Sequence, residues 1–342
     1  MKLCVLLGGP SAEREVSLVS GYAMATAYAA NGHDVTLLDP ATGRAMRLDE
    51  FKADRPKTTP PTNEELGKLS QGTVLLESLM SDTIRDAQIV VFGLHGVPGE
   101  DGPMQAVLEL LGKPFTGSKS RSSALSIDKA YTKAVLKDAG IAVPNGVVAP
   151  RGMDDSELRD LFHIAEHDLG LPLVIKPNDQ GSTVGLTILK QSDPDEFVRA
   201  CNLAWEWSPK ALIEEFVDGH ELTVTVLNGK ALPIVEIAPE GGFYDYHHKY
   251  TTGMTTYTCP AQIEPEIASA IQADALRVFE LCDARGYARI DYRMRPDGSF
   301  ACLEINTLPG MTSTSLVPKA ANAAGMSFGE LCEKILESAF MS

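Results

Sequence analysis

The chain has 342 residues, more than the ~250–300 at which a single hydrophobic core usually divides, so we expect two or three domains. It carries 46 acidic and 30 basic residues, and a formal net charge of -16 disfavours binding to nucleic acid or to an anionic membrane surface. No stretch approaches the ~18 uncharged apolar residues of a membrane span, and the six cysteines show no C-x-x-C spacing. We therefore expect free thiols and a cytoplasmic protein.

Strands and helices alternate in the first part of the chain, and this predicts a parallel sheet with helices on its faces. The predicted elements, in order, are a strand at residues 3–7, a helix at 17–30, a strand at 35–38 and a strand at 89–92. Between the last two strands, the polar residues 41–85 are predicted to form a surface insertion that carries no chemistry.

Two further segments begin near residues 118 and 212. Their predicted elements, in order, are a helix at 129–139, strands at 173–176, 185–189, 220–227 and 232–237, a helix at 264–284, a hairpin at 289–306 and a helix at 328–340. Asn228-Gly229 predicts a tight hairpin turn, and residues 239–260 form a long loop. We expect an α/β fold, α+β in part, with domains at residues 1–117, 118–211 and 212–342.

The hairpin at 289–306 predicts a metal site. If Asp297-Gly298 forms a two-residue turn, Asp291 faces Glu304 and Arg289 faces Asn306, all on one side of the hairpin. Opposed carboxylates repel each other unless a cation lies between them, and hard oxygen ligands favour Mg²⁺. A solvated acidic face is the alternative for the two carboxylates alone, and Asn306 favours the metal site because it adds a neutral oxygen ligand. The residues predicted to pack into the core from the opposite side are Ile290, Tyr292, Leu303 and Ile305.

A phosphate site is predicted without a known nucleotide motif. None of the three Gly-Lys pairs is followed by Ser or Thr, and no G-x-G occurs, so the Walker A and dinucleotide fingerprints are absent. Lys176 instead ends an apolar strand before a loop of small residues, whose backbone N–H groups can surround phosphate oxygens. An ordinary hairpin loop is the alternative. Lys129, Glu214 and Glu221 are candidate nucleotide contacts, with charged surface as the alternative for each.

Several blocks of this sequence resemble the signatures of D-alanine–D-alanine ligases of the ATP-grasp superfamily. The matching blocks, in family order, are residues 8–17 (GGPSAEREVS), 94–96 with 99–102 (LHG, GEDG), 126–129 (SIDK), 176–185, 243–250 (FYDYHHKY) and 304–316. They span nearly the whole chain and leave only residues 41–85 unmatched.

The resemblance implies a three-domain ATP-grasp fold. It also implies an enzyme that joins two D-alanines to form a peptidoglycan precursor, using ATP and two Mg²⁺ ions, with Mn²⁺ as a substitute. It also implies a homodimer. The implied catalytic residues are Glu13, Ser182, Tyr250, Arg289, Gly310 and Ser315. The implied ATP contacts are Lys129, Lys176, Ser182, Glu214, Glu215, Glu221 and Lys249. The implied D-alanine contacts are Glu13, His95, Arg289, Gly310 and Ser315, and the implied metal ligands are Asp291, Glu304 and Asn306.

Two positions bear on specificity. Glu215 stands where many family members carry lysine, which puts one adenine contact in doubt, and Tyr250 favours D-alanine over D-lactate as the second substrate without excluding D-serine. Two other functions remain as alternatives. One is an ATP-grasp ligase with different substrates, which Glu13, Tyr250 and Ser315 together disfavour, and the other is a non-catalytic nucleotide-binding protein.

Overall fold

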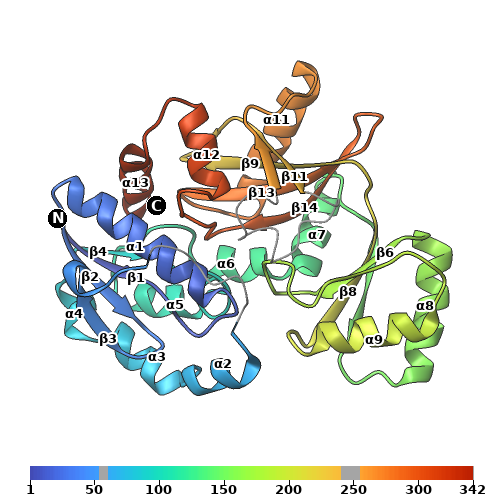
Figure 1. Cartoon of the computed structure of the whole chain (residues 1–342), viewed down its shortest axis with the longest axis horizontal. Helices are drawn as coiled ribbons and strands as arrows, with labels where there is room; N and C mark the ends of the chain where they lie inside the picture. The colour runs from blue at the N-terminus through green and yellow to red at the C-terminus, as the bar shows by residue number, and fades with distance from the viewer. Residues whose placement is uncertain (54–60, 240–254, 342) are drawn as a thin grey trace.

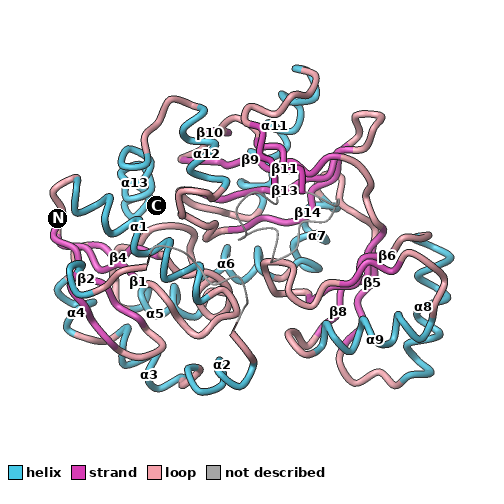
Figure 2. Tube along the Cα trace, viewed as in Figure 1, coloured by secondary structure: helices cyan, strands magenta, loops and turns pink. Residues whose placement is uncertain are grey.

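The computed structural model describes residues 1–53, 61–239 and 255–341, and within these ranges the strands form three sheets (Figure 1). Figure 2 shows the strands in three groups, each flanked by helices. No helix in the described ranges is long and apolar enough to cross a membrane.

The N-terminal sheet has the order β3-β2-β1-β4, with β1 parallel to both β2 and β4. Its elements are β1 Lys2–Leu6, α1 Arg14–Ala30, β2 Asp34–Asp39, β3 Arg44–Arg47, η1 Leu48–Glu50, α2 Asn63–Leu69, α3 Gly72–Leu79, α4 Asp82–Asp86, β4 Ile89–Phe92 and α5 Pro103–Leu110. Leu3 and Val5 of β1 enter one hydrophobic core, while Cys4 and Leu6 enter a second core on the other face. The continuous apolar run therefore becomes a strand buried on both faces, as parallel sheets require.

The segment expected to be a surface insertion is partly built into this domain. Its strand β3 pairs antiparallel with β2, and Leu79 and Ile84 are buried in the second core. The prediction is therefore wrong for these parts, because short amphipathic helices lie within an overall polar composition. That the segment carries no chemistry stays a prediction.

The central sheet is antiparallel, with the order β5-β8-β6-β7. The elements from here to its last strand are α6 Ser120–Ile127, α7 Lys129–Asp138, β5 Gly146–Pro150, α8 Asp155–Leu169, β6 Leu173–Pro177, β7 Thr187–Leu189, α9 Pro194–Trp205 and β8 Lys210–Glu215. Helices α8 and α9 lie against this sheet (Figure 1), and Phe162 of α8 and Phe197 of α9 belong to one core with its strand residues. Strand β8 crosses the expected boundary at residue 212 but pairs entirely within this sheet, so we place it in the central domain.

The C-terminal sheet has the order β12-β11-β9-β13-β14, and β10 pairs with β9. Its elements and the final helices are β9 His220–Leu227, β10 Lys230–Ala231, β11 Val235–Pro239, β12 Thr255–Thr258, α11 Pro265–Leu281, β13 Tyr287–Met294, β14 Phe300–Asn306, α12 Leu316–Ala323, α13 Phe328–Glu337 and η2 Ser338–Phe340. The predicted turn at Asn228-Gly229 is confirmed, because both residues have positive φ and Leu227 pairs directly with Lys230.

Helices α7 and α13 tie the domains together. Leu136 of α7 packs in one core with Ile290 and Tyr292 of β13, so α7 carries its side chains to the edge of the C-terminal sheet. Helix α13 packs against α1, where the Tyr28 hydroxyl donates a 2.9 Å hydrogen bond to the Cys332 carbonyl oxygen. The three sheets therefore meet around a common centre.

Candidate active site

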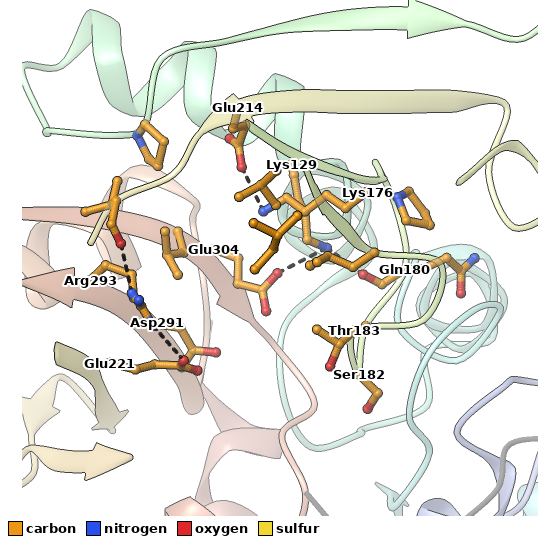
Figure 3. A pocket seen from close by; sticks show the side chains of 18 of the residues that line it. Lys129, Lys176, Gln180, Ser182, Thr183, Glu214, Glu221, Asp291, Arg293 and Glu304 are labelled. Atoms are coloured by element: carbon orange, nitrogen blue, oxygen red, sulfur yellow. Dashed lines mark hydrogen bonds and ion pairs between the residues drawn. The ribbon is translucent and has the colours of Figure 1, made fainter. Parts of the chain in front are cut away.

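Two adjoining pockets lie where the three sheets meet. We call the larger one the main cleft, and its apolar lining includes Val174, Leu186, Ile188, Phe216 and Leu303. The charged side chains of the main cleft include Lys129, Lys176, Glu214, Glu221, Asp291 and Glu304 (Figure 3). The second pocket is lined by, among others, Glu13, His95, Glu100, Asn306, Gly310 and Ser315. Ser182, Arg289 and Glu304 line both, so a molecule in the main cleft can meet one in the second pocket.

The facing carboxylates come from the predicted hairpin, whose register is confirmed at the site. Asp291 pairs with Glu304, and Arg289 pairs with Asn306. The turn itself differs from the prediction, because the Arg295 N–H donates to the Ser299 carbonyl oxygen at 2.7 Å and encloses three residues. A bulge after Asp291 offsets this extra residue.

The bulge also changes which side chains face the cleft. Asp291 pairs with Glu304 but the next residue, Tyr292, pairs with Cys302, so Leu303 is an additional residue on β14 with no partner position on β13. Leu303 was predicted to pack into the core, and this is wrong, because it is half-buried and lines the main cleft beside Glu304. Ile290, Tyr292 and Ile305 are buried as predicted.

Cations already neutralise both carboxylates. The Arg289 guanidinium donates to Asp291 through Nε at 2.9 Å and Nη2 at 2.8 Å, and Thr223 Oγ1 donates to Asp291 at 2.6 Å. Lys129 Nζ lies 3.1 Å from Glu304 Oε2. In the described part of the chain, no group of three His, Cys, Asp or Glu side chains has the spacing of a metal site. That criterion leaves out asparagine. The predicted ligand set consists of two carboxylates and the Asn306 amide oxygen, which are all hard oxygen donors, and it therefore fits Mg²⁺.

Helix α7 positions two lysines. Asp128 caps the helix by accepting from the Tyr131 N–H at 3.0 Å, which places Lys129 at the first helical position. Lys129 Nζ also donates to the Gln180 carbonyl oxygen at 2.7 Å, so it connects the β6–β7 loop to Glu304. One turn later, Lys133 projects from the same helix face.

A buried ion cluster borders the main cleft. Glu214 is 2% exposed, and its Oε1 accepts from Lys133 while its Oε2 lies 2.8 Å from Lys176 Nζ. Burial alone raises the pKa of Glu214, but the two lysines lower it below its ordinary value. For Lys133, burial outweighs Glu214 and lowers the pKa to about 8. Our sequence reasoning missed Lys133, although its position four residues after Lys129 places it on the same helix face.

The loop between β6 and β7 closes over the second pocket. Ser182 and Thr183 both have positive φ, and the Ser182 hydroxyl donates to Glu13 Oε1. A Cβ atom at Gly181 would lie 2.7 Å from Glu13 Oε2, so a side chain at this position would have to displace the Glu13 carboxylate. Residues 169 apart in the chain are thereby brought together.

A buried histidine and a buried acid lie deeper in the second pocket. His95 Nδ1 lies 2.6 Å from the Leu308 carbonyl oxygen, which fixes the proton on Nδ1, and burial lowers the pKa of the ring. Nε2 is buried and has no hydrogen-bond partner among the described residues, so the neutral ring presents an acceptor there. Glu100 accepts from the backbone N–H groups of Gly96 and Leu308 at 3.1 Å each. Burial, with Glu13 nearby, raises the pKa of Glu100 to about 7. Sequence reasoning assigned no role to Glu100.

The remaining predicted residues fall into three groups. Gly310 and Ser315 lie together in the second pocket, where a Cβ at Gly310 would lie 2.9 Å from Ser315 Oγ. Glu215 and Glu221 line the main cleft, and Arg293 Nη1 donates to Glu221 at 3.2 Å. Lys249 and Tyr250 lie outside the described residues.

Comparisons with known proteins agree with this arrangement. Residues 2–118 match the family model "D-ala D-ala ligase N-terminus", and residues 135–337 match "D-ala D-ala ligase C-terminus". A D-alanine–D-alanine ligase from Syntrophotalea carbinolica is 40% identical, over 99% of this chain and 96% of its own length. One from Moorella thermoacetica is 36% identical over 99% of both chains.

Solved structures give the same result. The D-alanine–D-alanine ligase of Bacillus anthracis complexed with ATP superposes with a TM-score of 0.78, at 27% identity and over 99% of this chain and 97% of that one. The VanG D-Ala:D-Ser ligase of Enterococcus faecalis superposes with a TM-score of 0.74, at 27% identity and over 99% of both chains. These likenesses confirm the expected ATP-grasp fold class. With full-length matches in both sequence and structure, the chain belongs to the D-alanine–D-alanine ligase family.

Proposed function

We propose that the protein joins two D-alanines into D-alanyl-D-alanine and converts ATP to ADP and phosphate, as its family membership supports. One observation carries the proposal to this chain: the main cleft and the second pocket share Ser182, Arg289 and Glu304. Making an amide from a carboxylate and ATP requires a nucleotide site next to an amino-acid site, and the two pockets meet that requirement.

The nucleotide lies in the main cleft in this proposal. The apolar side chains of Val174, Ile188 and Phe216 form a slot for the adenine ring, with Glu214 as an acceptor for its amino group. Glu221 holds the ribose. Lys129 and Lys176 neutralise the phosphates, and the family resemblance alone adds Lys249 to this set. The small residues around Ser182 cover the phosphates.

Asp291, Glu304 and Asn306 would hold two Mg²⁺ ions, with Mn²⁺ as a substitute. When bound, these ions neutralise charge on the transferred phosphoryl group. In this structure, Arg289 pairs with Asp291 and Lys129 pairs with Glu304. When the ions take these carboxylates, Lys129 can contact the phosphates and Arg289 the reacting carbonyl.

The chemistry proceeds in two steps. A carboxylate oxygen of the first D-alanine attacks the γ-phosphorus of ATP, ADP leaves, and a D-alanyl phosphate forms. The free amine of the second D-alanine attacks the carbonyl carbon of this intermediate, and phosphate leaves as the amide forms. Arg289 and the Gly310 N–H stabilise the tetrahedral oxyanion, and one such donor is typically worth about 2.7–4 kcal/mol.

The second pocket holds the amino acids. Glu13 binds the ammonium group of the first D-alanine, and Ser315 binds the carboxylate of the second. A neutral His95 accepts at Nε2, so it suits an ammonium group; the carboxylate contact implied by the resemblance requires the doubly protonated ring. The family's closing contact between Tyr250, Glu13 and Ser315 remains a proposal.

Release of phosphate by the purified protein with ATP, Mg²⁺ and D-alanine tests the function. We expect release only when D-alanine is present, and D-alanyl-D-alanine as the product. D-serine and D-lactate, offered as second substrates, test the alternative raised by the likeness to a D-Ala:D-Ser ligase. ATP turnover that does not depend on D-alanine would contradict the proposal.

The resemblance also supports two proposals about the protein in the cell. We propose a homodimer, which light scattering of the purified protein measures directly. We propose a cytoplasmic location, consistent with the free cysteines of the described chain.

A further inference from the structure

We propose that Lys133 is the permanent counter-ion of Glu214, and that ATP draws Lys176 away so that Glu214 Oε2 becomes free to accept from the adenine amino group. Lys133 is then a specificity-determining residue for adenine over guanine. This inference rests on the proposed use of ATP and goes beyond it, because it explains how a lysine-bound carboxylate can read a base.

The buried cluster carries an excess positive charge. Two ammonium groups flank a single carboxylate, so Lys133, Lys176 and Glu214 together carry one excess positive charge. All three side chains are at most 13% exposed. A buried excess charge is costly unless a partner neutralises it, and an anion entering the main cleft would do so.

The two lysines of the cluster are placed differently relative to the main cleft. Lys176 and Glu214 line the main cleft, and Figure 3 shows both there, beside Lys129 and Glu304. Lys133 approaches Glu214 from α7, and its side chain is 8% exposed. It lies near Cys302 of β14 and is not among the described residues that line the main cleft. Lys176 can therefore turn toward a phosphate, whereas Lys133 stays with Glu214.

Lys133 determines whether Glu214 is ionised when ATP is bound. Once Lys176 has moved, burial favours the neutral acid, and Lys133 is the cation that keeps the carboxylate ionised. An ionised carboxylate only accepts hydrogen bonds, so it pairs with the amino group of adenine and repels the carbonyl oxygen that guanine carries at the same ring position. A protonated acid could donate to that carbonyl oxygen. Loss of Lys133 therefore weakens ATP binding and relaxes discrimination against GTP.

The exchange of Lys133 for methionine tests this, because methionine has a similar length and no charge. Lys137→Met is the matched control, since Lys137 is exposed one turn later on α7. Calorimetric titration with Mg-ATP and with Mg-GTP, without D-alanine, measures nucleotide binding separately from ligation. We expect Lys133→Met to weaken ATP binding by about tenfold or more, the usual size of a charge-assisted hydrogen bond, and to lower the ATP-to-GTP affinity ratio by a similar factor.

Two further variants guard against a general loss of structure. Lys133→Arg keeps the charge and should retain most of the discrimination, whereas Lys133→Gln should lose it as Lys133→Met does; circular dichroism shows which variants fold. Unchanged ATP affinity and an unchanged ATP-to-GTP ratio in a folded neutral variant would overturn the inference. A wild-type protein that binds ATP but releases no phosphate with D-alanine would instead contradict the proposed function and leave the result for Lys133 valid.

Discussion

Replacing Glu100 with glutamine should raise the stability of the unliganded protein, relative to that of the wild type, as the pH rises from 4.5 to 8. Glu100 is 5% exposed, and its pKa in the folded chain is about 7, against an ordinary value of 4.5. Below pH 4.5 both the folded and the unfolded chain hold this proton. Between pH 4.5 and 7 the unfolded chain releases it while the folded chain keeps it, so the free energy of unfolding falls as pH rises through this window.

The size of the effect follows from the difference between the two pKa values. At about 1.4 kcal/mol per pKa unit, a pKa of about 7 instead of 4.5 costs the folded protein about 3 kcal/mol once the pH is above 7. Glutamine removes the charge, but it has one acceptor oxygen for the two N–H donors of Gly96 and Leu308, so one of these hydrogen bonds is lost at every pH. The stability of the variant relative to the wild type should therefore rise by up to about 3 kcal/mol between pH 4.5 and pH 8, on top of a pH-independent loss from the missing hydrogen bond.

Urea unfolding of both proteins at several pH values from 4.5 to 8 measures this difference, because groups common to both proteins cancel. Glu77→Gln, an exposed carboxylate on α3, is the control and should show no such trend. Removing the charge of Glu13, which helps to raise the pKa of Glu100, should shrink the effect. A stability difference between wild type and Glu100→Gln that stays constant with pH would refute the reasoning.

Two other predictions concern turnover. Asp291→Ala and Glu304→Ala should each abolish D-alanine-dependent phosphate release while circular dichroism remains that of the wild type, and near-normal activity in either would contradict the metal assignment. Gly181→Ala should lower kcat/KM for D-alanine about 10- to 100-fold, because its Cβ displaces the Glu13 carboxylate from its present position, whereas Gly67→Ala, with open space around it, should be neutral in the same assay.

The sequence was most informative where short-range rules decide structure. Asn228-Gly229 formed the predicted tight turn, and Asp291 and Glu304 faced each other as expected. The second success depended on two compensating errors, since the turn at Asp297-Gly298 holds one more residue than predicted and the bulge beside Leu303 absorbs it. Side-chain alternation cannot reveal a bulge, because an added residue shifts the pattern only locally.

Contacts between distant segments were beyond sequence reasoning. The hydrogen bond between Ser182 and Glu13 and the hydrogen bond between the Leu308 N–H and Glu100 each join residues more than 160 positions apart. Family resemblance named Glu13 and Ser182 as site residues, but nothing in the spacing indicated that Glu100 would be buried against the second pocket. Lys133 was within reach of a helical argument, yet its charge alone predicts a solvated surface position, and only the fold reveals its pairing with Glu214.

The central claim is that a D-alanyl phosphate forms where the two pockets adjoin and is then attacked by the amine of the second D-alanine. The position of one carboxylate oxygen atom after the reaction tests this claim. The enzyme is supplied with ATP, Mg²⁺ and D-alanine labelled with ¹⁸O in its carboxylate, and the released phosphate is analysed by mass spectrometry. Because a carboxylate oxygen attacks the γ-phosphorus and then leaves with it, each phosphate should carry one ¹⁸O atom. Phosphate without the label, released together with D-alanyl-D-alanine, would contradict the account.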